Sequence, residues 1–230
     1  MELICPAGTP VALRDAVDAG ADAVQCGFAD ETNATHSLAL HFTRDELAEA
    51  IGYAHAAGVK IIVAVDSFMR AGAESLWTLA VDDAVALGAD ALQVADIGLL
   101  AYVADRHPQQ ARHIALQLAA ATVPHIGFLA EAFGIRRAVL PRGLLVEEVL
   151  QIAREAPCEI EAAAAGVSIR RQGHADALVG PSLDLLGHLA ELQRAGLTAI
   201  KVEDAPRGSA YIRGLAGEIR TTAEPEEQAA

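Results

Sequence analysis

Several apolar stretches of this sequence end in polar side chains that could do acid–base chemistry. Lys201 and Glu203 belong to the stretch AIKVED, and residues i and i+2 of a strand share one face, so both can point to the same side. Asp66 ends KIIVAVD, and His36 lies in a long polar loop. We take Lys201, Glu203, Asp66 and His36 as candidate catalytic residues for proton transfer. The alternative for Lys201 and Glu203 is an internal ion pair that only fixes strand register.

Six further polar residues are candidates for substrate binding: Asn33, Asp96, Gln117, Arg142, Glu161 and Arg170. Gln117 and Glu161 stand within apolar strands, so each must pair across the interior or meet a ligand. Asp96 precedes a helical pattern, so capping that helix is its alternative role. Arg142 and Arg170 can pair with a carboxylate or a phosphate. Their alternative is a solvated position that offsets an acidic surface.

No motif in the sequence has the spacing of a metal site. His36, His41 and His174 lack ligand spacing, and no CxxC pair occurs. Cys5, Cys26 and Cys158 are odd in number and far apart, which is typical of reduced, buried thiols in a cytoplasmic protein. We therefore predict no metal and a cytoplasmic location.

Composition limits the classes of partner. The formal charge is -14, which argues against a surface that binds DNA through its phosphates. Hydrophobic residues make up 53% of the chain, enough for a large core. No stretch approaches the roughly 20 apolar residues that span a bilayer, and the first residues lack the basic start of a secretory signal. We expect neither DNA binding nor a transmembrane segment.

The chain alternates short apolar strands with amphipathic helices eight times, which predicts parallel strands joined by crossover helices. The predicted strands are ELIC, AVQCG, KIIVAVD, ALQVAD, HIALQLA, RAVLPR, EIEAAAAG and AIKVED. Eight units favour a single-domain α/β fold, a (β/α)8 TIM-barrel-like domain over residues 1–220, with a polar tail over 221–230. An open doubly wound sheet is the alternative, although CPAGTP after the first strand is not a dinucleotide fingerprint.

Segments along most of residues 1–220 resemble the collagenase-like peptidase family (U32). They are MELICPAGTPVALRDAVDAGADAVQCG, DETNATH, LGADALQVADIGLL, RAVLPRGLLVEEV and AGLTAIKVEDAPRGSAYI. The chain is most similar to UbiU-type members. That resemblance implies a role in oxygen-independent ubiquinone biosynthesis, in which an aromatic or quinone precursor is hydroxylated together with a second family member and an iron–sulfur cluster. Other relatives hydroxylate RNA bases, and some are described as peptidases.

The sequence departs from the family where cluster-binding members carry cysteines. Val167, Ser168 and Ile169 follow Gly166, and no cysteine occurs after Cys158. A [4Fe-4S] cluster needs thiolate ligands, so we predict no cofactor. The expected partners are a small aromatic or quinone-like ligand and a paralogue or a second copy of the chain. The alternatives are a non-catalytic scaffold and a peptidase, although GxSxG and HExxH motifs are absent.

Overall fold

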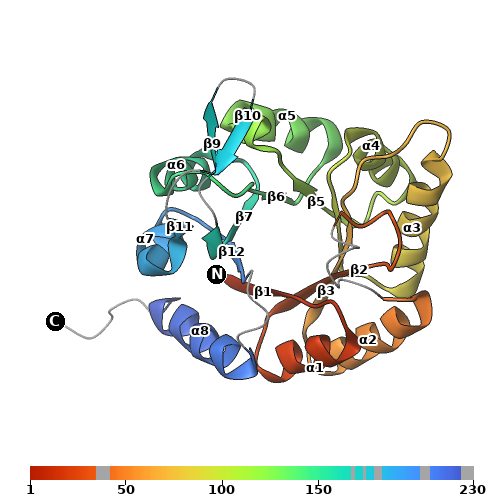
Figure 1. The fold of residues 1–230 in the computed structure, drawn as a ribbon, viewed down its shortest axis with the longest axis horizontal. Helices are drawn as coiled ribbons and strands as arrows, with labels where there is room; N and C mark the ends of the chain where they lie inside the picture. Colours follow the sequence, from red (N-terminus) through yellow and green to blue (C-terminus); the bar gives the residue numbers. More distant parts are fainter. Residues whose placement is uncertain (35–41, 167–168, 173–174, 179–182, 203–207, 224–230) are drawn as a thin grey trace.

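The eight predicted strands form a closed parallel barrel in the computed structural model of this chain (Figure 1). The structure describes residues 1–34, 42–166, 169–172, 175–178, 183–202 and 208–223. Around the barrel the strand order is β1-β12-β7-β6-β5-β4-β3-β2. The barrel strands are β1 (Glu2–Pro6), β2 (Ala23–Gly27), β3 (Lys60–Val65), β4 (Ala91–Val94), β5 (Ala111–Ala115), β6 (Arg137–Val139), β7 (Glu159–Ala163) and β12 (Ala199–Lys201). Because β1 pairs with both β2 and β12, the sheet has no edge and the open-sheet alternative is excluded.

Helices cover the outside of the barrel and run back between successive strands (Figure 1). They are α1 (Pro10–Asp18), α2 (Arg44–Ala56), α3 (Glu74–Leu87), α4 (Ile97–Arg106), α5 (Val123–Phe133), α6 (Val146–Glu155), α7 (Leu189–Arg194) and α8 (Gly208–Ala223). Helix α2 begins with a capping box, because Thr43 and Glu46 each accept a hydrogen bond from the other's backbone N–H group. None of the helices in the described part of the chain has both the length and the hydropathy that crossing a bilayer requires.

The structure differs from the sequence prediction near the carboxyl terminus. The predicted alternation of strand and helix is interrupted before α7, where β11 (Leu183–Asp184) pairs antiparallel with β8 (Ala165–Gly166) and the short 3-10 turn η3 (Leu185–His188) follows. Helix α8 continues to Ala223, into the segment predicted to be a polar tail.

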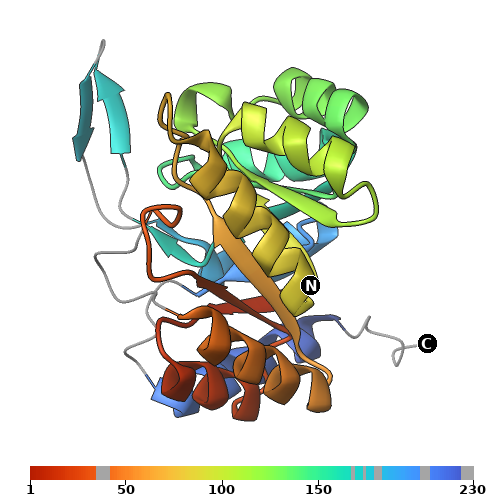
Figure 2. The ribbon, with the colours of Figure 1, turned by 90° about the vertical axis from the view of Figure 1, so that its right-hand side faces the viewer.

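Arg170 and Arg171 lie on a two-stranded hairpin that follows the barrel strand β7. The hairpin consists of β9 (Ile169–Gln172) and β10 (Ala175–Leu178), with Arg170 opposite Ala177 and Arg171 opposite Asp176. Figure 2 shows it standing away from the barrel, on the same side as the loop that follows β2. The predicted role of Arg170 in substrate binding stays a prediction.

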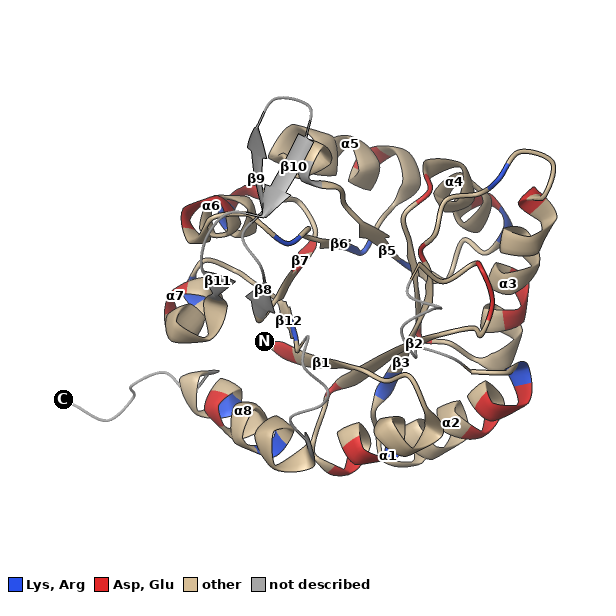
Figure 3. Ribbon diagram, in the orientation of Figure 1, with Lys and Arg blue, Asp and Glu red and all other residues tan. Residues whose placement is uncertain are grey.

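The apolar core lies mainly between the strands and the helices, and the barrel interior is different. Inside the barrel, a small cluster contains only Ile4 and Ile62 among small alanines: Ala23, Ala91 and Ala199. Bulky branched side chains fill the interior of most barrels of this type. Here charged residues stand on the barrel strands as well as on the outer helices (Figure 3). Small side chains therefore take the place of most of the bulky ones inside this barrel.

Candidate functional site

At the carboxyl ends of β2, β3 and β4, a small polar cluster forms around Asp66. One carboxylate oxygen of Asp66 accepts a hydrogen bond from the backbone N–H of Ala34 at 2.9 Å, and the other accepts from the side-chain amide of Gln93 at 3.1 Å. Gln93 is buried, and its Oε1 has no hydrogen-bond partner within the described part of the chain. Because a carboxylate only accepts, the bond to Asp66 fixes the orientation of the Gln93 amide. A buried acceptor therefore stays available beside a carboxylate.

Asn33 lies against the end of β2 and is fully buried. A Cβ at Gly27 would collide with the Asn33 side chain, so a glycine is needed here for the loop to close over the strand. The loop is also tied to the next strand–helix connection. Ser67 donates a hydrogen bond from its backbone to the carbonyl of Thr32 at 3.2 Å, and its hydroxyl donates to the carbonyl of Glu31 at 2.6 Å. These bonds hold Asn33 rigidly at the carboxyl-end opening.

Asp96 acts as a helix cap. Its Oδ1 accepts from the backbone N–H groups of Gly98 at 2.7 Å and Leu99 at 3.0 Å, and its Oδ2 accepts from Met69 at 3.3 Å. The capping interpretation is therefore confirmed, and both oxygens of the carboxylate are occupied. Its predicted role in substrate binding stays a prediction.

Two of the predicted binding residues lie outside the strands to which the sequence assigned them. Gln117 is exposed and follows the end of β5, where it precedes the 3-10 turn η2 (Leu118–Ala120). Arg142 is exposed in a turn beyond β6, next to Gly143, whose φ of 96° requires the left-handed conformation. Both strands end early because the chain turns at these points. The predictions that Gln117 lies within a strand and that Arg142 lies at a strand end were therefore wrong.

Glu161 and Lys201 come close together inside the barrel, on the neighbouring strands β7 and β12. Glu161 is almost fully buried and lies opposite Ala199, while Lys201 lies opposite Ala163. Burial raises the pKa of Glu161, although the charges of Lys201 and Arg137 act in the opposite direction. Glu203, predicted to act with Lys201, and His36 lie outside the described residues.

The amino-terminal end of the barrel contains a buried charge network that the sequence prediction did not include. Arg137 is its centre, with Nη2 at 2.6 Å from Glu2 and 2.6 Å from Glu159, and Nη1 at 3.6 Å from Glu161. Lys60 forms a further ion pair with Glu2 at 2.7 Å. Burial alone would raise the pKa of Glu2, but its bonds to Lys60 and Arg137 outweigh that effect and lower it. We call these five residues the amino-end network.

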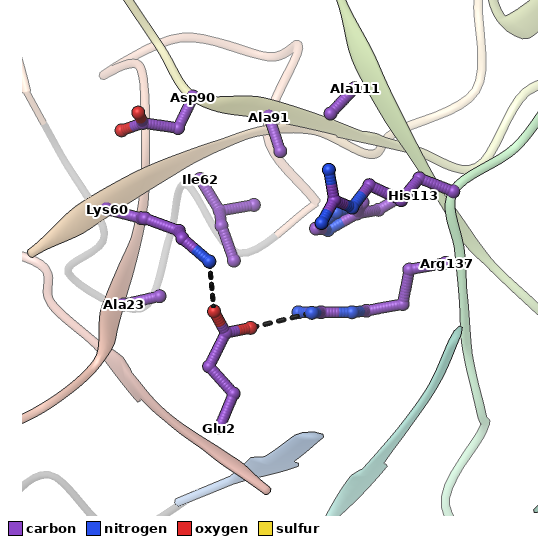
Figure 4. A pocket seen from close by; sticks show the side chains of 10 residues that line it. Glu2, Ala23, Lys60, Ile62, Asp90, Ala91, Ala111, His113 and Arg137 are labelled. Atoms are coloured by element: carbon purple, nitrogen blue, oxygen red, sulfur yellow. Dashed lines mark hydrogen bonds and ion pairs between the residues drawn. The ribbon is translucent and has the colours of Figure 1, made fainter. Parts of the chain in front are cut away.

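Next to this network lies a cavity of about 200 Å³ that opens at the amino-terminal end. Its walls are the network residues Glu2, Lys60 and Arg137 with Ile62, His113 and several alanines (Figure 4). His113 is buried, and its Nδ1 has no hydrogen-bond partner in the part of the chain that the structure describes. Burial, aided by the charge of Arg137, lowers the pKa of His113 to about 3, so its ring is neutral at physiological pH.

The amino-end network had a signal in the sequence. Glu2, Lys60, Arg137 and Glu159 are each the first residue of an apolar strand. Residues i and i+2 of a strand share a face, so each of these charges points to the same side as an interior residue such as Ile4 or Ile62. Charged residues that open several strands of a closed barrel must meet inside it.

The three cysteines do not fit the iron–sulfur cluster that the family resemblance implies. Cys5 and Cys26 belong to the core between strands and helices, and burial raises the pKa of each thiol to about 12. Cys158 is half-buried, directly before β7, and burial raises its pKa as well. Cluster ligation needs thiolates that converge on one point, whereas these thiols are protonated and belong to three separate parts of the barrel. The described residues also hold no group of three or more His, Cys, Asp or Glu side chains that could hold a metal ion.

Comparison with models of protein families identifies the family of this chain. The model of peptidase family U32 matches residues 8–173, which include the Asp66 cluster and most of the amino-end network. The chain belongs to peptidase family U32. The resemblance seen in the sequence is thereby confirmed.

Two curated relatives in Escherichia coli K12 are named for hydroxylation of RNA. The chain is 32% identical over 164 residues to the tRNA hydroxylation protein P, and 30% identical over 164 residues to the 23S rRNA 5-hydroxycytidine C2501 synthase. These alignments cover 70% of this chain but only 35% and 24% of the relatives. The chain thus spans about a third or less of the length of these relatives.

Solved structures of other proteins superpose on the barrel of this chain. A U32 peptidase, Mk0906, superposes with a TM-score of 0.62 at 14% identity, covering 88% of this chain and 92% of that one. Tryptophan synthase from M. tuberculosis gives a TM-score of 0.62 at 17% identity, covering 97% of this chain and 93% of that one. At such low identities the likeness establishes the fold alone.

Proposed function

We propose that this chain takes part in the hydroxylation of an aromatic ring, and that its part is to bind and orient the ring at the carboxyl-end opening of the barrel. The observation that carries the proposal is the buried Oε1 of Gln93 beside Asp66, which has no hydrogen-bond partner among the described residues. A ring hydroxyl or ring amine can donate to that oxygen, and a buried acceptor left unpaired carries an energetic cost. The curated relatives named for hydroxylation support the same class of reaction.

The redox chemistry of such a reaction is assigned to a partner, a paralogous family member. The reason is the placement of the cysteines, which are protonated and separated in this chain. In this scheme Asp66 fixes the Gln93 amide, and Asn33 forms a rigid side of the opening. Lys201 and Glu203 stay the proposed groups for moving protons to and from the ring.

The ring that we favour is a small phenolic or quinone-type precursor, as expected in oxygen-independent ubiquinone biosynthesis. The net charge of -14 opposes close approach of an RNA backbone, whereas a neutral phenol meets no such repulsion. A nucleobase in RNA is the second candidate, and the names of the two Escherichia coli relatives favour it.

Binding measurements test the proposal. Titration calorimetry with phenol should show binding that weakens at least tenfold in Gln93→Leu, because the acceptor oxygen is lost. Thr43→Ala is the matched control, since it removes the cap of α2 and should leave phenol binding unchanged. Equal binding to the wild type and to Gln93→Leu would contradict the assigned site. Tighter binding of cytidine than of phenol would replace the phenolic ring with the nucleobase.

A further inference from the structure

The cavity at the amino-terminal end of the barrel has three features that together indicate a ligand. It is about 200 Å³ in volume and opens to solvent at one end. Two of its polar atoms, His113 Nδ1 and Arg137 Nη1, are buried without a hydrogen-bond partner among the described residues. Each such atom costs free energy unless water or a ligand satisfies it. A second site, separate from the Asp66 cluster, follows from this arrangement.

The hydrogen-bond donors around the cavity favour a ligand that accepts hydrogen bonds. Arg137 uses Nε and Nη2 for Glu159 and Glu2, which leaves Nη1 with Glu161 at 3.6 Å, beyond hydrogen-bond distance. A neutral His113 can donate through one ring nitrogen. A ligand that accepts from several donors at once satisfies this set.

The charges at the cavity wall favour an anion over a neutral ligand. Three cations, Lys60, Arg136 and Arg137, line the cavity with two carboxylates, Glu2 and Asp90, while Glu159 just outside this lining pairs with both arginines. The charges of Arg137, Arg136 and Lys60 each act to lower the pKa of His113, while only that of Glu2 acts to raise it. The ring of His113 therefore lies in a positive potential.

The size of the cavity sets the size of the ligand. Ala23, Ala91, Ala111 and Ile62 form its apolar wall (Figure 4). An engineered apolar cavity of about 150 Å³ takes up benzene, so this space can hold a ring-sized group as well as a few water molecules.

We infer that the amino-end cavity binds a small organic carboxylate, whose oxygens accept from Arg137 and His113 while its apolar part lies against the alanines. The site is independent of the proposed ring hydroxylation, because it lies at the opposite end of the barrel from Asp66. The network of Glu2, Lys60 and Arg137 holds the arginine in place for the ligand.

Benzoate is the probe, with benzamide as its uncharged equivalent. Titration calorimetry should show benzoate binding at least tenfold tighter than benzamide. NMR of the histidine ring should show that benzoate raises the pKa of His113, because an anion replaces part of the positive potential. Equal affinities for the two probes, or an unchanged His113 resonance at saturating benzoate, would show that the cavity holds only water and would overturn the inference.

Substitutions at the cavity test whether benzoate binds at this location. Ala111→Leu fills the cavity and should weaken benzoate binding at least tenfold, while Ala115→Leu, further along the same strand beyond His113, is the matched control and should not. Lys60→Gln removes one cation at the solvent-exposed rim and should weaken binding severalfold even if Ala111→Leu fails to fold. Benzoate binding that survives both Ala111→Leu and Lys60→Gln would contradict this location.

Discussion

The two ends of this barrel use polar residues in opposite ways. At the carboxyl end, Asp66 has its two oxygens occupied by neutral amide donors, and the open position is the carbonyl oxygen of Gln93. At the amino end, ionised groups are packed around Arg137, and the open positions include a guanidinium nitrogen and a neutral imidazole. One end therefore suits a neutral donor and the other an anionic acceptor. The two ends of a single barrel can therefore offer chemically distinct binding groups.

The largest expected effect comes from removing the centre of the amino-end network. Arg137→Met should lower the free energy of unfolding by about 3–5 kcal/mol, because three carboxylates lose their buried cation. Denaturant unfolding measures the change. Arg136→Met is the matched control, since Arg136 makes one exposed ion pair with Glu159 and should cost less than about 1 kcal/mol. Similar losses in both variants would remove the distinction between a buried network and a surface pair.

A smaller effect should appear as a pH dependence of stability that arises from His113. The pKa of His113 is about 3 in the folded protein, whereas the ordinary value for histidine is 6.5. Below pH 6.5 the unfolded chain therefore binds a proton that the folded chain does not bind. Stability is therefore full above pH 6.5 and is lost as the pH falls toward 3, by about 1.4 kcal/mol per pH unit.

Thermal or denaturant unfolding between about pH 5 and pH 7 isolates this dependence from most carboxylates, whose ordinary pKa values are about 4. His113→Gln should flatten the profile in this window. A slope that persists unchanged in His113→Gln would mean that the ring titrates normally, and the amino-end pocket would then lack its neutral imidazole.

The smallest effect should come from the capping residue at the other end. Asp96→Ala should lower stability by about 1 kcal/mol through loss of the α4 cap, with phenol binding unchanged. Denaturant unfolding and calorimetry on the same sample measure both quantities. Weaker phenol binding in Asp96→Ala would instead show that Asp96 contributes to binding the ring.

The sequence predicted the barrel because periodicity reports burial, and every strand of the closed sheet repeats the same apolar pattern. It could also offer both roles of Asp96, since capping depends on local spacing. Gln117 and Arg142 were misplaced because strand ends depend on where the chain turns, which neighbouring strands help to decide. The pairing of Arg137 with Glu2 joins residues 135 positions apart, and only the closure of the barrel brings them together. The local pattern of a sequence does not predict contacts of that kind.

A crystal structure of the chain with phenol and benzoate bound together tests most directly whether the two ends bind different ligands. We expect phenol beside Gln93 and Asp66, and benzoate against Arg137 and His113 at the opposite end. Both molecules in one opening, or only water beside Arg137 at saturating benzoate, would contradict it.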